Sequence, residues 1–287
     1  MKPKETINLY RVISLLVIAL VTFGVMGGLG AKSHLYPDEW LSMFFLTLIF
    51  LLVCMFELEY ERKQKGISAN TQTTFIRLSV TYTVSGGLIY AISYLPEFYR
   101  PVMIPVILLT AVSNSMVAVS FGLFFDLVLA LTVGGSFYAL AAYMMLTMLA
   151  AVLAQALKEK KYRMGVSLLT FFFSLMIPEL FSYLSTKEMQ KYSLLYAFGT
   201  ALLTFLTAAF LFHRLLHEAD QEIENHLLDI VSEDYSEVKA LKDFSMVEYR
   251  HAVKVSDIAC RCAKEVGYRA NLCLAGGFFF FLGGWVG

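Results

Sequence analysis

Residues 101–157 read PVMIPVILLTAVSNSMVAVSFGLFFDLVLALTVGGSFYALAAYMMLTMLAAVLAQAL, and their one charged side chain is Asp126. About 20 apolar residues cross the hydrocarbon core of a bilayer, so this block of about 57 residues has the length for one span or three. A single helix would be far too long. Weak turn signals at Ser113-Asn114-Ser115 and at Gly134-Gly135 divide the block instead. We therefore predict three membrane spans here.

Five further apolar runs near the length of a span flank this block. They cover about residues 13–31, 40–56, 78–95, 164–184 and 193–212. The sequence thus predicts an all-α membrane protein with about eight transmembrane helices, followed by a short helical tail. We place a short terminal segment at 1–12, the transmembrane unit at 13–214 and the tail at 215–287.

The composition agrees with a membrane protein. Hydrophobic residues make up 58% of the chain and charged residues only 16%, against about 25% charged in an average soluble domain. This excess excludes a soluble enzyme, a secreted disulfide scaffold and a disordered chain. Lys+Arg 23 balances Asp+Glu 23, so no basic excess points to nucleic acid. The expected partner is the lipid bilayer of the cell membrane.

Basic residues predict the orientation. With the amino terminus inside, eleven Lys and Arg residues lie in cytoplasmic segments and four in external ones, which is the positive-inside bias. Eight spans then return the tail to the cytoplasm. The first apolar run resembles a signal peptide, but it is longer than a usual signal core and another span follows at once. We favour a retained span.

Two polar side chains lie inside the apolar block. Asp126 is costly in hydrocarbon and is expected to face the bundle interior. It is either an ion or proton site, or a residue at a short turn or a protonated, hydrogen-bonded packing residue. We favour the second, because we find no second carboxylate or Arg in neighbouring spans. Asn114 could bind a ligand, but we favour a turn or an interhelical hydrogen bond.

The tail predicts several helices. Residues 217–233 continue out of the last span, a break follows, and residues 238–244 precede a second helix that stops at Gly267. A third helix begins near residue 270.

Several stretches of this tail carry a family resemblance. They are LLDIVSED from Leu227, EYRHA around His251 continuing as HAVKVSDIA, AKEVG ending at Gly267, and AGGFFFFLG from Ala275. They resemble the opening of an HD-domain phosphohydrolase, from about residue 247. More narrowly, the chain is similar to the bacterial seven-transmembrane HD proteins, the membrane cyclic-di-AMP phosphodiesterases. Its span count resembles that architecture without the extracellular domain.

The resemblance implies a metal site that this chain does not complete. It implies His251 as the first ligand and assigns the defining His-Asp pair to Phe280 and Phe281. Phenylalanine offers no lone pair to a metal. A divalent metal such as Mn, Mg or Fe is therefore expected only if another part of a longer chain, or a partner, completes the site.

Three hypotheses follow. The first is a non-catalytic relative of this family with a sensory, regulatory or scaffolding role, acting as a homodimer or through a partner protein that binds the tail. The second is a metal-dependent cyclic-dinucleotide phosphohydrolase whose HD domain is incomplete in this chain. The third is a small-molecule or ion transporter centred on Asp126.

Overall fold

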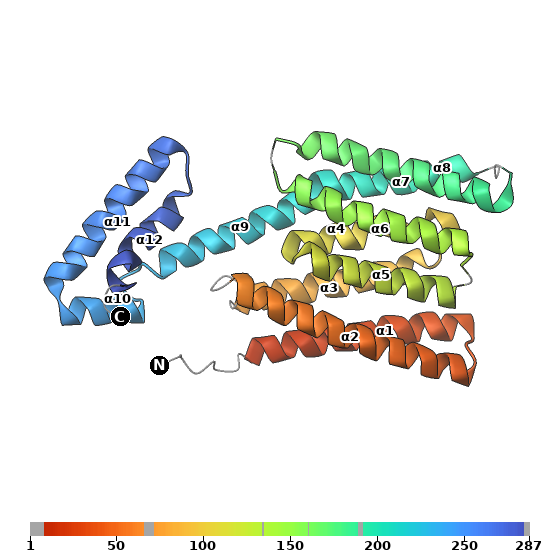
Figure 1. The fold of residues 1–287 in the computed structure, drawn as a ribbon, viewed down its shortest axis with the longest axis horizontal. Helices are drawn as coiled ribbons and strands as arrows, with labels where there is room; N and C mark the ends of the chain where they lie inside the picture. Colours follow the sequence, from red (N-terminus) through yellow and green to blue (C-terminus); the bar gives the residue numbers. More distant parts are fainter. Residues whose placement is uncertain (1–8, 66–71, 134, 160, 189–191, 284–287) are drawn as a thin grey trace. The chain divides into compact units, whose positions relative to one another are not determined.

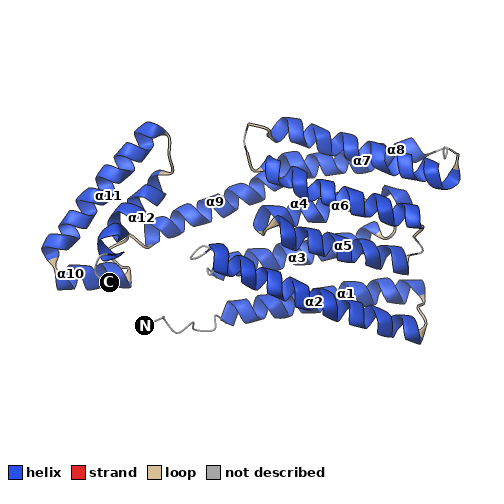
Figure 2. Cartoon of the chain, in the orientation of Figure 1, coloured by secondary structure: helices blue, strands red, loops and turns tan. Residues whose placement is uncertain are grey.

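A computed structural model describes residues 9–65, 72–133, 135–159, 161–188 and 192–283, and every regular element within these ranges is a helix (Figure 2). The contacts between residues divide the chain into two units, Met1–Leu216 and His217–Gly287. We call them the membrane unit and the tail unit. The amino-terminal residues predicted to be cytoplasmic lie outside the described residues as far as residue 8.

The membrane unit is built from long helices joined by short connections (Figure 1). They are α1 (Leu9–Ser33), α2 (Pro37–Lys65), α3 (Gln72–Ile92), α4 (Met103–Val112), α5 (Ser115–Thr132), α6 (Phe137–Leu157), α7 (Arg163–Thr186) and α8 (Ser193–Leu206). A short 3₁₀ turn, η2 (Glu97–Tyr99), lies between α3 and α4. A π-helical turn, η3 (Thr207–Leu211), joins α8 to α9 (Phe212–Asp229).

Seven helices in the described ranges are long and apolar enough to cross a bilayer, which confirms the prediction of a multi-pass all-α membrane protein. The block at 101–157 forms three helices, and the first break falls at Ser113-Asn114 as predicted. Of the second predicted break, Gly134 lies outside the described residues. The first of the three helices, α4, has 10 residues. At about 1.5 Å per residue it is only about half as long as the hydrocarbon core is thick.

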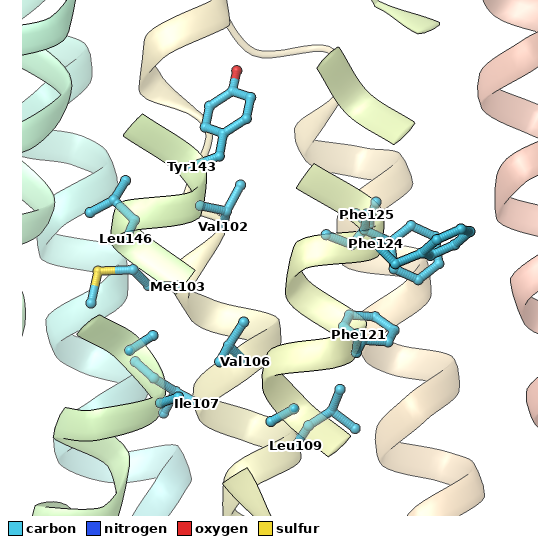
Figure 3. Packing of buried hydrophobic residues seen from close by; sticks show 14 of the residues in the cluster. Val102, Met103, Val106, Ile107, Leu109, Phe121, Phe124, Phe125, Tyr143 and Leu146 are labelled. Atoms are coloured by element: carbon cyan, nitrogen blue, oxygen red, sulfur yellow. The ribbon is translucent and has the colours of Figure 1, made fainter. Parts of the chain in front are cut away.

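Helix α4 is an interior helix. Every residue from Met103 to Ala111 is buried, and α4 packs against α3, α5, α6 and η3. Figure 3 shows Met103, Val106 and Ile107 of α4 in one cluster with Phe121 of α5 and Leu146 of α6. An apolar sequence on all sides of a helix suits burial on all sides, so α4 fills the centre of the bundle.

The segment that contains α4 still takes the chain from one end of the bundle to the other. Before α4, Glu97 accepts a hydrogen bond from the backbone N–H of Ser136, at the start of α6. After α4, Ser115 accepts a hydrogen bond of 2.7 Å from Gln155, near the end of α6. The beginning of α1 and the end of the last span, Ser193–His217, therefore lie at the same end of the membrane unit (Figure 1).

The outside of the membrane unit carries large apolar side chains. They include Leu20, Phe56, Val152 and Leu195, each more than 60% exposed. Such surfaces are rare on soluble proteins and are expected where acyl chains replace water.

The tail unit continues from α9 with α10 (Ser236–Phe244), α11 (Met246–Val266) and α12 (Ala270–Gly283). The side chain of Ser245 caps α11 by accepting a bond of 3.4 Å from the N–H of Glu248. Helix α11 ends at Gly267, whose φ of 76° is left-handed. Glycine adopts this conformation without strain, and the predicted stop at Gly267 is confirmed.

A small core holds the tail unit together. Its buried members are Val238 and Leu241 of α10, Ala252 of α11 and Phe278 of α12. Helices α11 and α12 approach closely at Gly277, where a Cβ would lie 3.1 Å from the Cα of Ser256.

Candidate functional site

Asp126 lies in the middle of α5, not at a turn, and its side chain is fully buried. The Thr147 hydroxyl on α6 donates a hydrogen bond of 2.6 Å to Oδ2 of Asp126. Oδ1 has no hydrogen-bond partner among the described residues. Buried polar atoms are normally paired, so this carboxyl group is half satisfied.

Gly122 brings Thr147 within reach of Asp126. Gly122 and Asp126 are four positions apart and lie on one face of α5. A Cβ at Gly122 would lie 2.6 Å from Cγ2 of Thr147 and 2.8 Å from Cγ2 of Val106. The missing side chain therefore lets α6 and α4 pack closely against α5 at the carboxyl group.

A second polar contact lies one helical turn away on α6. Tyr143 donates its hydroxyl to the backbone carbonyl of Glu97, and Arg100 donates from Nη1 to the same hydroxyl at 3.2 Å. Arg100 also donates from Nε to the carbonyl of Leu95 at 3.4 Å. Tyr143 and Thr147 lie four positions apart on one face of α6, so this contact lies one turn along α6 from the hydrogen bond to Asp126.

Arg100 is itself buried, with 4% of its surface exposed. Within the described ranges, neither Arg100 nor Asp126 is part of an ion pair. The hydrogen-bond partners of both residues in the described ranges are thus uncharged groups.

The sequence analysis found no second carboxylate or Arg in the spans that neighbour Asp126, and for the carboxylate this is wrong. Glu57 lies inside the span Pro37–Tyr60 of α2 and contacts α5. Glu57 accepts a hydrogen bond of 2.7 Å at Oε1 from Ser120 of α5, and its buried Oε2 has no partner among the described residues. The sequence analysis ended the second span at residue 56, whereas α2 continues to Lys65. A glutamate directly after an apolar run was the signal that we missed.

Asn114 lies at the turn between α4 and α5, where it occupies the N-cap position of α5. Its side chain makes no capping bond to α5 and accepts a hydrogen bond of 3.3 Å from Ser115 Oγ. This geometry suits a chain reversal better than ligand binding.

The proposed metal positions of the tail lie on α11 and α12. The ring centroids of Tyr249 and Phe278 are 6.2 Å apart, so the start of α11 lies beside the second half of α12. His251 is exposed, and Phe280 is 78% exposed. The side chain of Phe281 lies outside those the structure describes.

No group of three or more His, Cys, Asp or Glu side chains in the described ranges could hold a metal ion. Within these ranges, His251 is therefore not part of a set of metal ligands.

No known protein family, curated protein or solved structure matches this chain. The fold defines the class of the protein as a multi-pass α-helical membrane protein with a short helical region after the last span. A more specific role has to be argued from the residues.

Proposed function

We propose that this chain is a non-catalytic relative of the seven-transmembrane HD proteins with a regulatory or scaffolding role. The observation that carries the proposal is the exposed Phe280 on α12, at the position where the resemblance requires the metal-binding histidine. The helix pair would keep the shape of an HD opening without its metal chemistry.

The chemistry of the family explains why this one position matters. A metal-dependent phosphohydrolase needs several His and Asp ligands to hold ions that activate a water molecule. Phenylalanine cannot replace a histidine in this role, because it has no lone pair to donate. His251 alone would hold a divalent ion too weakly for hydrolysis.

The outer face of α12 supports a role in protein contact. Leu272 and Phe280 are exposed, and they lie eight positions apart on one side of the helix with Gly276 between them. An apolar stripe of this kind is a candidate contact for a partner or for a second copy of the chain.

An activity assay tests the absence of catalysis. The purified full chain in lipid nanodiscs is incubated with Mn²⁺ and cyclic di-AMP, and we expect no metal-dependent hydrolysis. Hydrolysis that disappears in His251→Ala and persists in the tail control His226→Ala would overturn the proposal.

A gain-of-function variant tests the resemblance itself. The double substitution F280H/F281D restores the side chains that the family pattern requires, and we expect it to increase Mn²⁺ affinity at least tenfold by calorimetry. Adding His251→Ala should remove the gain. The shifted control F279H/F280D has the same composition and should gain nothing. Equal Mn²⁺ binding by the two double variants would contradict the assignment of the His-Asp pair to positions 280 and 281.

A further inference from the structure

Asp126 is the most deeply buried carboxyl group described in the membrane unit. We propose that Oδ1 of Asp126 is a proton-binding site, connected to one end of the bundle by polar side chains on α6. This inference goes beyond the regulatory role proposed above, because it needs no residue of the tail unit.

The first step concerns charge. An ionised carboxylate among apolar side chains is costly unless it is paired. Thr147 supplies one hydrogen bond, to Oδ2, and no ion pair among the described residues offsets the charge. A proton taken up from water forms an O–H bond at Oδ1 and removes the charge, while Thr147 continues to donate to Oδ2.

The second step identifies the ligand as a proton. Hard divalent cations take six or more oxygen ligands. Among the described residues, the hydroxyl of Thr147 is the hydrogen-bond partner of this carboxyl group, and Oδ1 has none. The neighbouring helix α4 has the sequence MIPVILLTAV, and its one hydroxyl, on Thr110, donates to the carbonyl of Val106 at 2.8 Å. A proton needs a single oxygen.

The third step concerns access. Thr147 and Tyr143 lie four positions apart, on one face of α6. Tyr143 contacts Arg100 and the carbonyl of Glu97, and Glu97 contacts the backbone at the start of α6. Polar side chains of α6 therefore lie both at Asp126 and, one helical turn away, at the connection between α3 and α4.

The other helices that pack against α5 also carry titratable groups. Helix α6 carries Tyr138 and Tyr143, α4 carries none, and α3 places Tyr82 against Phe121 of α5, with ring centroids 5.0 Å apart. Helix α2 carries Cys54 and Glu57 in its apolar run and Asp38, Glu39, Glu59 and Tyr60 nearer its ends, and α1 carries its described charged side chains, Arg11 and Lys32, near its ends.

Glu57 provides a matched comparison. It meets α5 at Ser120, six positions before Asp126, and residues six apart lie about 120° apart around a helix with 3.6 residues per turn. Glu57 is thus a second half-satisfied carboxyl group, on a different flank of α5.

Infrared difference spectroscopy tests the proposal on the full chain in nanodiscs. Between acidic and alkaline pH we expect the C=O stretch of a protonated carboxyl group to appear and disappear. This band should be lost in Asp126→Asn and kept in Glu57→Gln. A spectrum that Asp126→Asn leaves unchanged would overturn the proposal.

Two further measurements cover other outcomes. Thr147→Val removes the hydrogen bond to Asp126 and should move the same band to higher frequency. Thr147→Ser keeps a hydroxyl and should leave the band in place. These two variants test the proposal even if Asp126→Asn does not fold. The band should be insensitive to Na⁺. If Na⁺ removes it and Asp126→Asn abolishes the Na⁺ effect, the ligand is an alkali ion and the proton site is rejected.

Discussion

Single atoms decide how closely the helices of the membrane unit approach one another. Gly122 has no room for a Cβ between Thr147 and Val106, whereas a Cβ added at Gly87 of α3 would meet no neighbouring atom within 4 Å. The two glycines have the same intrinsic cost in a helix, so a difference between their alanine variants reports the packing around each glycine.

The two substitutions to alanine should have opposite effects. Gly122→Ala forces α5 away from α6 and should lower the free energy of unfolding by about 1–3 kcal/mol, as overpacking does. Gly87→Ala should raise it by about 0.5–1 kcal/mol, because alanine loses less backbone entropy. Reversible unfolding in mixed detergent micelles measures both, and an equal effect of the two would contradict the packing at Gly122.

A charged contact at the tail surface predicts a dependence on pH. Lys242 donates a hydrogen bond of 2.9 Å to Glu233, and this bond with the positive charge of Lys242 holds the pKa of Glu233 below its usual range. A lowered folded-state pKa stabilises the fold above the unfolded-state pKa, and the gain is lost as the pH falls through the folded-state value.

We therefore expect Glu233→Gln to weaken the tail unit slightly at neutral pH and not at all in acid. The effect is small because the pair is exposed to solvent. Hydrogen exchange of the α10 amides across pH measures it, with Asp257→Asn, an exposed carboxylate on α11, as the control. A loss of protection in Glu233→Gln that is the same at every pH would argue against a titrating contact.

Helix α4 could be predicted from the sequence, but its position inside the bundle could not. Its apolar run and the turn at Ser113-Asn114 are visible in the sequence, so the division into three helices could be predicted. The role of α4 could not, because hydropathy is the same for a side chain that faces lipid and one that faces other helices. Glu57 was missed for a related reason, since a hydropathy window ends a span at its first charges although the helix and its packing continue.

Substitutions at two leucines test the interior position of α4. Leu109 of α4 is fully buried, whereas Leu195 of α8 is 70% exposed. Leu109→Ala leaves a cavity and should cost about 2–5 kcal/mol. Leu195→Ala shortens an exposed side chain and leaves no cavity inside the protein, so it should cost far less. If unfolding measurements give both variants the same loss, α4 does not form the centre of the bundle.

At the scale of the whole molecule, the direction of the helices and the charge bias combine into a prediction of sidedness. The start of α1 and the end of the last span, Ser193–His217, lie at one end of the membrane unit (Figure 1). The basic residues favour the cytoplasm for that end. The tail, with its exposed Cys262, should then be cytoplasmic, and the connection between α7 and α8 should be external.

Thiol labelling tests this orientation. A membrane-impermeant maleimide should leave Cys262 unmodified in intact cells and modify it in inverted vesicles, because the reagent reaches only one side. In a Cys273→Ser background, which removes the half-buried second thiol of the tail, the label should disappear in Cys262→Ser. Lys187→Cys, at the exposed end of α7, should behave in the opposite way. If intact cells label Cys262 and not the cysteine at position 187, the charge bias does not govern this protein and the tail faces outward.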